Sequence, residues 1–286
     1  SSNAHLENDL NLVRTVKSKL FNAVHKAQVS WNRIRPLLDS VNEEEEGKEW
    51  EPGDLEVKDV SFAYPDGKRV LEHVSFSAKP GQIIGVTGPV ACGKSTLGKL
   101  FLCECPYEGT VRFAGKDLLQ MEETEHKGIV AYLGHDPELF YDSVRDNVLL
   151  GDEKDLKTYL KAVCIDREVS EMEEGEDTLI GNGGVRLSGG QAQRVALART
   201  LCHKKPILVL DDPFSALDKS TEREVFSNVR AITRDSIVLL LSHRLYLFPQ
   251  MDQIIWMDEG KTTVGTHEEL LLKVPAYAAL FTTQEG

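Results

Sequence analysis

A glycine loop closed by a lysine and a serine constrains the fold of this 286-residue chain more than any other feature. Residues 88–95 read Gly-Pro-Val-Ala-Cys-Gly-Lys-Ser, between an apolar run at 83–86 and a helical pattern at 96–102. Such a strand–loop–helix unit wraps backbone N–H groups around phosphate oxygens, to which Lys94 adds a full charge and Ser95 a hydroxyl for Mg²⁺. The strand must deliver the loop to the edge of an open sheet, so the motif predicts an α/β fold with a phosphate site.

Short apolar runs recur along the rest of the chain and alternate with helical segments. They lie at 207–210, 237–241 and 254–257, and each is continuous, as in strands that are buried on both faces. Because strands that alternate with helices pair in parallel, the pattern predicts a mainly parallel core sheet.

Two further regions complete the expected architecture. Residues 55–78 alternate apolar and polar positions around a turn signal at 64–67, which predicts an antiparallel β-layer. Residues 137 to about 180 are mostly helical in pattern, and strong helical patterns follow at 191–202 and 266–281.

Composition and charge exclude several classes of protein. The net charge is −13, whereas a nucleic-acid partner needs a basic face. No apolar run approaches the ~18 residues of a membrane-spanning helix. The odd number of cysteines suits a reducing compartment, and Cys103-x-Cys105 lacks a second pair at zinc spacing. Residues 1–4 are typical of the scar left when an expression tag is removed, and we exclude them.

Two more motifs bear on the phosphate site. The buried run at 207–210 ends at Asp211, which places a carboxylate where ligands bind in open α/β sheets, as a direct or water-mediated Mg²⁺ ligand. The segment Leu187-Ser188-Gly189-Gly190-Gln191 taken alone is a glycine-rich helix cap. A chain with its own phosphate loop uses such a segment only if the segment reaches a nucleotide held by another copy or by a partner.

In this order, the motifs resemble those of the nucleotide-binding domain of an ABC transporter, over about residues 54–284. The match assigns Tyr64 to the A-loop, 88–95 to Walker A, 187–191 to the signature, Asp211 to Walker B, 215–218 to the D-loop and His243 to the switch position. The resemblance implies a P-loop NTPase core of α/β class, with a mainly parallel sheet, an N-terminal antiparallel β-subdomain and a helical signature subdomain at about 137–200. It also implies ATP and Mg²⁺ as ligands.

The resemblance gives individual residues their expected roles. The nucleotide would be held by Tyr64, Gly88, Pro89, Val90, Ala91, Cys92, Gly93, Lys94, Ser95 and Thr96. Mg²⁺ would be held by Ser95, Asp211 and His135, and a nucleotide on a second cassette would be contacted by Ser188, Gly189, Gly190 and Gln191. Three alternatives stay open: Tyr64 as turn packing rather than an adenine platform, His243 as a core histidine, and Cys92 either as a reactive thiol or as a small residue facing away from the phosphates.

Three positions depart from the family pattern. After Asp211 the family normally has a glutamate that polarises water, and here Asp212 is one methylene shorter, which spoils water positioning where near-attack geometry is demanding. His135 stands where the Q-loop has glutamine, so its hydrogen bonding depends on pH. Asn182 replaces a glutamate in the loop before the signature, which removes a charge from the surface that faces the membrane domain.

The departures suggest an asymmetric ATPase. We expect Asp212, His135 and His243 to be the catalytic residues of a slow or non-hydrolytic site, while the intact signature completes the competent site of a partner in a heterodimer. The alternatives are a fully hydrolytic homodimer and a regulatory module that binds nucleotide without turnover. A soluble ABC protein that acts on DNA or ribosomes would need a basic face or a second cassette.

One segment within the cassette and the segment before it resemble those of exporters. Residues 136–148 are similar to exporter-type domains, and residues 5–52 resemble the helical tail of a membrane domain followed by an acidic linker. We therefore expect residues 53–286 to form the cassette of a longer chain, at the cytoplasmic face of the cell membrane. The partners would be the membrane helices of that chain and a second cassette, and the transported substrate is not encoded here.

Overall fold

The computed structural model describes residues 50–285, so the predicted tag scar and helical tail and most of the acidic linker lie outside the described residues. The strands are β1 (Leu55–Ala63), β2 (Arg69–Ala78), β3 (Ile83–Thr87), β4 (Glu108–Phe113), β5 (Lys116–Asp117), β6 (Val130–Leu133), β7 (Asp142–Ser143), β8 (Leu179–Ile180), β9 (Ile207–Asp211), β10 (Ile237–Leu241), β11 (Gln253–Asp258) and β12 (Lys261–Gly265). The α-helices are α3 (Lys94–Leu100), α4 (Glu123–Lys127), α5 (Val144–Leu149), α6 (Leu156–Ala162), α7 (Asp166–Ser170), α8 (Gly189–Cys202), α9 (Lys219–Ile232), α10 (His267–Lys273) and α11 (Pro275–Glu285).

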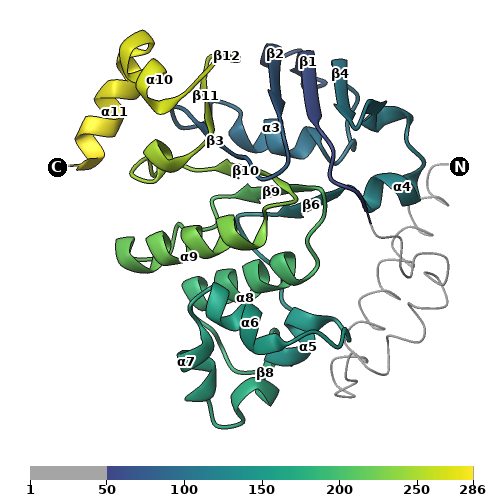
Figure 1. The fold of residues 1–286 in the computed structure, drawn as a ribbon, viewed down its shortest axis with the longest axis vertical. Coiled ribbons are helices and arrows are strands. Elements are labelled where there is room, and N and C mark those ends of the chain that lie inside the picture. The colour runs from purple at the N-terminus through teal and green to yellow at the C-terminus, as the bar shows by residue number, and fades with distance from the viewer. Residues whose placement is uncertain (1–49, 286) are drawn as a thin grey trace, which may run out of the picture.

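A six-stranded sheet of order β12-β11-β3-β10-β9-β6 forms the centre, and its pairs are parallel except β11–β12. Along β9, Leu208 and Leu210 pack in the core with α8 and α9, whereas Ile207 and Val209 pack in the core shared with β1 and β2. Figure 1 shows the two layers on opposite sides of this sheet. Because both faces are covered, each central strand is apolar throughout, and the predicted fold class is confirmed.

The antiparallel layer has the order β2-β1-β4-β5. The turn between β1 and β2 closes where the Gly67 N–H donates to the Tyr64 carbonyl at 2.8 Å, with Gly67 at φ +84°. The layer is tied to the central sheet where the Glu72 N–H donates to Gly260 O, 2.8 Å away in the β11–β12 turn. This tie closes one end of the space in front of the phosphate loop.

Four helices, α5 to α8, form the lower part of the molecule in Figure 1. Two short strands, β7 and β8, join the segment after β6 to the segment before the signature. A Cβ on Gly181 would lie 2.5 Å from Phe140 O, and Gly181 has φ +81°, so glycine permits this close approach. Asn182 next to it is exposed.

Two features of the C-terminal region differ from the sequence prediction. The single helix expected at 266–281 is two helices, because Pro275 starts α11 and forces Val274 into an extended conformation (φ −123°, ψ 93°). Strand β12 was not predicted, since it is half-exposed and polar and pairs only at the sheet edge.

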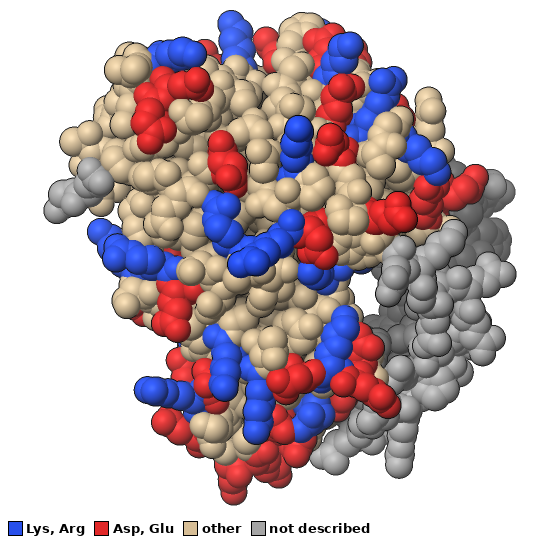
Figure 2. All heavy atoms as spheres, in the orientation of Figure 1, with Lys and Arg blue, Asp and Glu red and all other residues tan. Residues whose placement is uncertain are grey.

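No helix among residues 50–285 is long and apolar enough to cross a bilayer. On the face shown in Figure 2, basic and acidic side chains are interspersed over the described part of the chain, and acidic groups gather over the lower helices. This face therefore has no continuous basic area of the kind that a nucleic acid needs.

Candidate nucleotide-binding site

The phosphate loop leaves β3 and enters α3 in a conformation that needs its glycines. A Cβ on Gly88 would lie 2.0 Å from Met257 O, so the loop can approach β11 only without a side chain. Gly93 caps α3 at φ +102°, and Ala91 also has a positive φ of 62°. Lys94 Nζ folds back over the loop and donates to Gly88 O at 3.2 Å. The ammonium group thus stays above the loop, where phosphate oxygens would lie.

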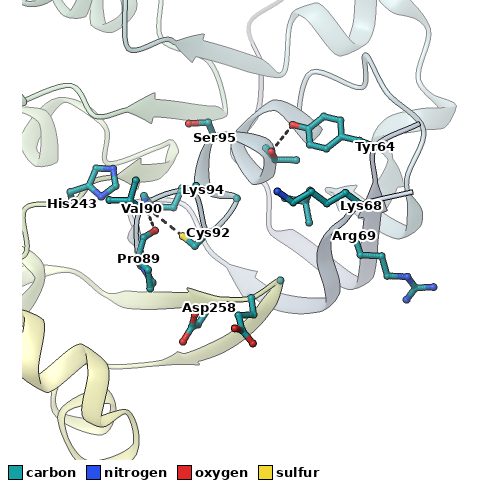
Figure 3. Close-up of a pocket in the computed structure, with 16 residues that line it drawn as sticks. Tyr64, Lys68, Arg69, Pro89, Val90, Cys92, Lys94, Ser95, His243 and Asp258 are labelled. Atoms are coloured by element: carbon teal, nitrogen blue, oxygen red, sulfur yellow. Dashed lines mark hydrogen bonds between the residues drawn. The ribbon is translucent and has the colours of Figure 1, made fainter. Parts of the chain in front are cut away.

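Cys92 is a buried residue of the phosphate loop. Its side chain packs in the core shared with the antiparallel layer, yet it also lines the cleft in front of the loop, and Sγ lies 3.5 Å from Lys94 Nζ (Figure 3). The burial fits a small packing residue beside the lysine.

A cleft of about 590 Å³ runs from the loop to the β11–β12 turn. Tyr64 stands at its wall with 44% of its surface exposed, and the Tyr64 and Thr96 hydroxyls are 2.9 Å apart (Figure 3). The ring also meets Phe62 edge-on, with centroids 5.1 Å apart. The Tyr64 ring is thus held at one edge, and part of its surface is accessible from the cleft.

A second cavity of about 280 Å³ adjoins the loop and brings together residues from four separate segments. They are Lys94, Ser95, His135, Asp211, Asp212, Leu241, Ser242 and His243. All the residues expected to bind Mg²⁺ and all the expected catalytic residues therefore share one space. The sequence separates them, and the parallel order of β3, β10 and β9 brings them to one edge.

Asp211 is buried at the end of β9, and its Oδ2 accepts a hydrogen bond from the Tyr132 hydroxyl at 3.0 Å. Burial, together with the Asp211 carboxylate, raises the pKa of Tyr132 well above its usual range, so Tyr132 stays a neutral donor. Sequence reasoning missed Tyr132, although it precedes His135 by only three positions. The donor set fits Mg²⁺, which binds one or two protein oxygens and takes its other ligands from phosphates and water.

Asp212 faces His135 across the second cavity, with 3.7 Å between Asp212 Oδ2 and His135 Nδ1. The Asp212 side chain is 17% exposed and the His135 side chain 57% exposed. Burial raises the pKa of Asp212 above its usual value, against the opposing effects of His135 and His243. Burial, followed by the nearby Lys94, lowers the pKa of His243, so its imidazole is neutral at physiological pH.

The signature segment lies away from both cavities, and none of its residues lines either one. Ser188 caps α8 and accepts a hydrogen bond from the Gln191 N–H, while the Gln191 side chain bonds back to the Ser188 N–H and to Glu168. A Cβ on Gly190 would lie 3.1 Å from Ala216 O, but one on Gly189 would meet nothing within 4 Å. The segment is thus a helix cap within this chain, with an open position at Gly189.

The segment that carries His243 is joined to the D-loop by contacts that the sequence did not reveal. Arg244 donates to Phe214 O at 2.9 Å and to Leu217 O at 2.8 Å. Its guanidinium also lies 2.8 Å from the buried Glu222 carboxylate, an ionic contact without the direction of a hydrogen bond. The only signal in the sequence was the position of Arg244 directly after the switch histidine.

Comparisons with known proteins identify the family. Residues 71–215 match the family described as "ABC transporter". The chain is 32% identical over 285 residues to a probable multidrug resistance ABC transporter ATP-binding/permease protein, YheI of Bacillus subtilis (94% of this chain, 49% of the relative). It is 35% identical over 261 residues to the ATP-dependent lipid A-core flippase of Vibrio parahaemolyticus (87% and 45%).

Among solved structures, the fold is similar to that of a bacterial Atm1-family ABC exporter with ATP bound, at a TM-score of 0.77 and 30% identity, covering 84% of this chain and 43% of that one. The chain thus spans about half the length of the curated transporters named above. The family match covers just over half of the chain. The chain belongs to the ABC transporter family and is an ATP-binding cassette homologous to those of ABC exporters.

Proposed function

We propose that this chain binds MgATP and works as one half of a head-to-tail pair of cassettes, which closes around nucleotide and drives an exporter. Lys94 and the loop amides would hold the phosphates, and the Tyr64 ring would support the base. Ser95 would bind Mg²⁺, with Asp211 acting directly or through water and His135 beside them. The bound cation would neutralise charge on the terminal phosphates.

The observation that carries this proposal is the open position at Gly189. Glycine costs helix stability, and here no positive φ and no neighbouring atom within the described chain requires it. The signature also lies apart from the chain's own cavities. A residue that the chain's own fold does not need is explained by a ligand that arrives from outside, such as the γ-phosphate bound to a second cassette.

We further propose that the chain's own site hydrolyses ATP slowly. Asp212 is one methylene shorter than the family's glutamate, and its carboxylate lies beside His135 rather than free over the loop. Since a displacement of about 1 Å costs up to about 100-fold in rate, the shorter side chain is a sufficient cause. The partner in a heterodimer would then supply the competent site, which this chain's signature completes.

The test is single-turnover ATP hydrolysis by the purified chain, alone and with its cognate cassette. We expect Asp212→Glu to raise the rate at least about tenfold, because it restores the reach of the carboxylate. Asp212→Asn is the matched control and should abolish the remaining rate. A fast wild-type rate that Asp212→Glu leaves unchanged would instead support a hydrolytic homodimer.

The contact between His135 and Asp212 favours a second candidate, a regulatory module that binds nucleotide without turnover. A carboxylate engaged by an imidazole is less available to polarise water. Nucleotide affinity together with no measurable hydrolysis, even with the partner present, would support this function. Turnover by the wild-type chain would exclude it.

The relatives support a proposal about the membrane partner and the location of the cassette. These relatives are an ATP-binding/permease protein and a flippase, so we infer that membrane helices of the same full-length chain are the second partner. The cassette would then lie at the cytoplasmic face of the membrane. The exposed Asn182, next to the contact between Gly181 and Phe140, lies where we propose that motion passes to those helices.

A further inference from the structure

His243 lies in a segment without regular structure that directly follows β10, and it lines both cavities beside the phosphate loop. In the described part of the chain, one hydrogen bond is made to His243 itself, and it comes from Gln284 in the last turn of α11. A residue outside every known motif thus holds the backbone of the switch histidine.

The Gln284 carboxamide makes two hydrogen bonds to the backbone of this segment. Its Nε2 donates to His243 O at 2.7 Å, and its Oε1 accepts from the Leu245 N–H at 2.7 Å. The two backbone groups flank Arg244 and point to the same side, as they do in a strand that pairs with a neighbour. The Gln284 side chain therefore makes the two hydrogen bonds that a neighbouring strand would make. Together they fix the position of residues 243–245 and their rotation about the chain axis.

The opposite side of the segment is also held. Arg244 donates to the carbonyl of Phe214, just before the D-loop, and to that of Leu217 within it, and the Arg244 N–H donates to Ser242 Oγ at 3.0 Å. The segment is thus bracketed between the D-loop and α11. The backbone that carries His243 is therefore held by contacts on both sides.

Helix α11 is docked by the same face that carries Gln284. Tyr277 is fully buried and Phe281 nearly so, and with Gln284 they occupy positions i, i+4 and i+7 of one helical stripe. The Tyr277 hydroxyl lies 2.7 Å from His267 Nδ1, and the Tyr277 ring meets Trp256 edge-on. In Figure 1, α10 and α11 (yellow) lie at one end of the molecule, beside the strands that deliver the site.

We propose that Gln284 is a positioning residue of the nucleotide site, which holds His243 toward the γ-phosphate through the backbone of residues 243–245. This inference rests on the proposed function, because it assigns His243 a nucleotide contact. The proposal makes α11 a part of the switch region. Packing of α11 against the rest of the chain, rather than bound nucleotide, keeps it in place.

The test uses the 286-residue chain with Gln284→Leu, which keeps the bulk of the side chain but removes both hydrogen bonds. Thr283→Ala is the matched control, since Thr283 is exposed on the same helical turn and its hydroxyl bonds only to Ala279 O. We expect amide exchange at Leu245, whose N–H bonds to Gln284 Oε1, to rise about tenfold in Gln284→Leu and to stay unchanged in Thr283→Ala. Unchanged exchange in Gln284→Leu would overturn the proposal.

The functional arm compares the affinity for ATP with that for ADP, together with kcat and KM of hydrolysis. We expect Gln284→Leu to lower kcat about tenfold with little change in KM, and to reduce the preference for ATP over ADP. If exchange is faster but kcat and the preference for ATP over ADP are unchanged, the hydrogen bonds of Gln284 only support the structure, and the positioning role is excluded. If the wild-type chain has no turnover, the proposed hydrolytic function fails, and the ATP-to-ADP preference alone decides the role of Gln284.

Discussion

At the scale of the residue, the carboxylate of Asp212 and the ring of Tyr64 show how local placement decides chemistry. Asp212 is largely buried, so burial raises its pKa, and the His135 imidazole lies 3.7 Å from its carboxylate. Tyr64 is fixed through its hydroxyl yet keeps an accessible ring. The first placement lowers the expected rate of hydrolysis, and the second raises the expected affinity for a purine nucleotide.

The Tyr64 ring, not its hydroxyl, should carry the affinity for the base. We expect Tyr64→Ala to weaken ATP binding by roughly 1–3 kcal/mol, the range measured for loss of base stacking on an aromatic ring. Tyr64→Phe removes the contact with Thr96 but keeps the ring, so its dissociation constant should stay within about threefold. Titration calorimetry with ATP measures both, and equal losses in the two variants would contradict a stacking role.

At the scale of the element, helices α8 and α9 both begin at caps that serve more than one purpose. Ser188 caps α8 while leaving Gly189 open, and Asp218 caps α9 through the N–H groups of Ser220 and Thr221. One turn into α9, Glu222 is buried against Arg244. The first turn of each helix thus contains a capping residue and a second feature that bears on a nucleotide site. In α8 this feature is the open position at Gly189, and in α9 it is the contact between Glu222 and Arg244.

Gly189→Ala should stabilise the isolated chain and impair its function. Alanine favours the helix by up to about 1 kcal/mol over glycine, and its methyl group meets nothing within the chain. We expect the melting temperature to rise, while ATP-dependent pairing weakens because the methyl group occupies the approach path of the partner's phosphate. Gly190→Ala is the control with a close neighbour, Ala216 O, and should not stabilise. A Gly189→Ala chain that pairs normally would exclude the role in trans.

Glu222 should make folding stability depend on pH. Burial raises the pKa of Glu222 to about 7 in the folded chain, against the opposing effect of Arg244, from an ordinary value of 4.5. Between these values the folded state keeps a proton that the unfolded state has released, so this stability is lost as pH rises toward 7. The Glu222→Gln variant has no ionisable group at this position, so it does not undergo this loss of stability.

We therefore expect the melting temperature of Glu222→Gln, relative to wild type, to increase from pH 5 to pH 8. Calorimetric melting scans at pH 5, 6, 7 and 8 would show the trend. Glu224→Gln, at an exposed position of the same helix, should show no such trend. A constant difference between Glu222→Gln and wild type across this range would show that Glu222 is ionised throughout.

At the scale of the whole molecule, the fold places the phosphate loop and the signature segment apart from each other. The phosphate loop lies at the edge of the central sheet, and the signature starts α8 on the helical side. Neither cavity includes both segments. On the proposed function, two complete sites would require two cassettes that face each other in opposite directions.

Mixing two defective chains should restore one of these sites. Lys94→Ala removes the phosphate charge but leaves the signature intact, and Gly189→Asp places a carboxylate where the partner's phosphate should lie. Neither chain should associate with itself on addition of MgATP, whereas the mixture should, because one intact loop meets one intact signature. Analytical ultracentrifugation measures this. A mixture that stays monomeric while the wild-type chain pairs would show that the motifs do not act in trans.

The sequence by itself determined the fold class and the identity of the site, because both depend on local patterns. The Gly88–Ser95 loop needs a strand before it and a helix after it, and continuous apolar runs such as 207–210 need cover on both faces. The apolar run at 207–210 also indicated Asp211 at its end, so periodicity and spacing are enough to reveal these features. The switch role of His243 came only from the family resemblance.

Only the tertiary structure decided the contacts between distant segments. Tyr132 bonding to Asp211, Arg244 reaching the D-loop and Gln284 gripping the switch segment join residues 27 to 79 positions apart. Such pairs have no period and no spacing rule, because they depend on which strand edges and helix faces the parallel sheet brings together. The break at Pro275 was visible in the sequence, but its consequence, the placing of Gln284 beside the switch histidine, required the packed helix.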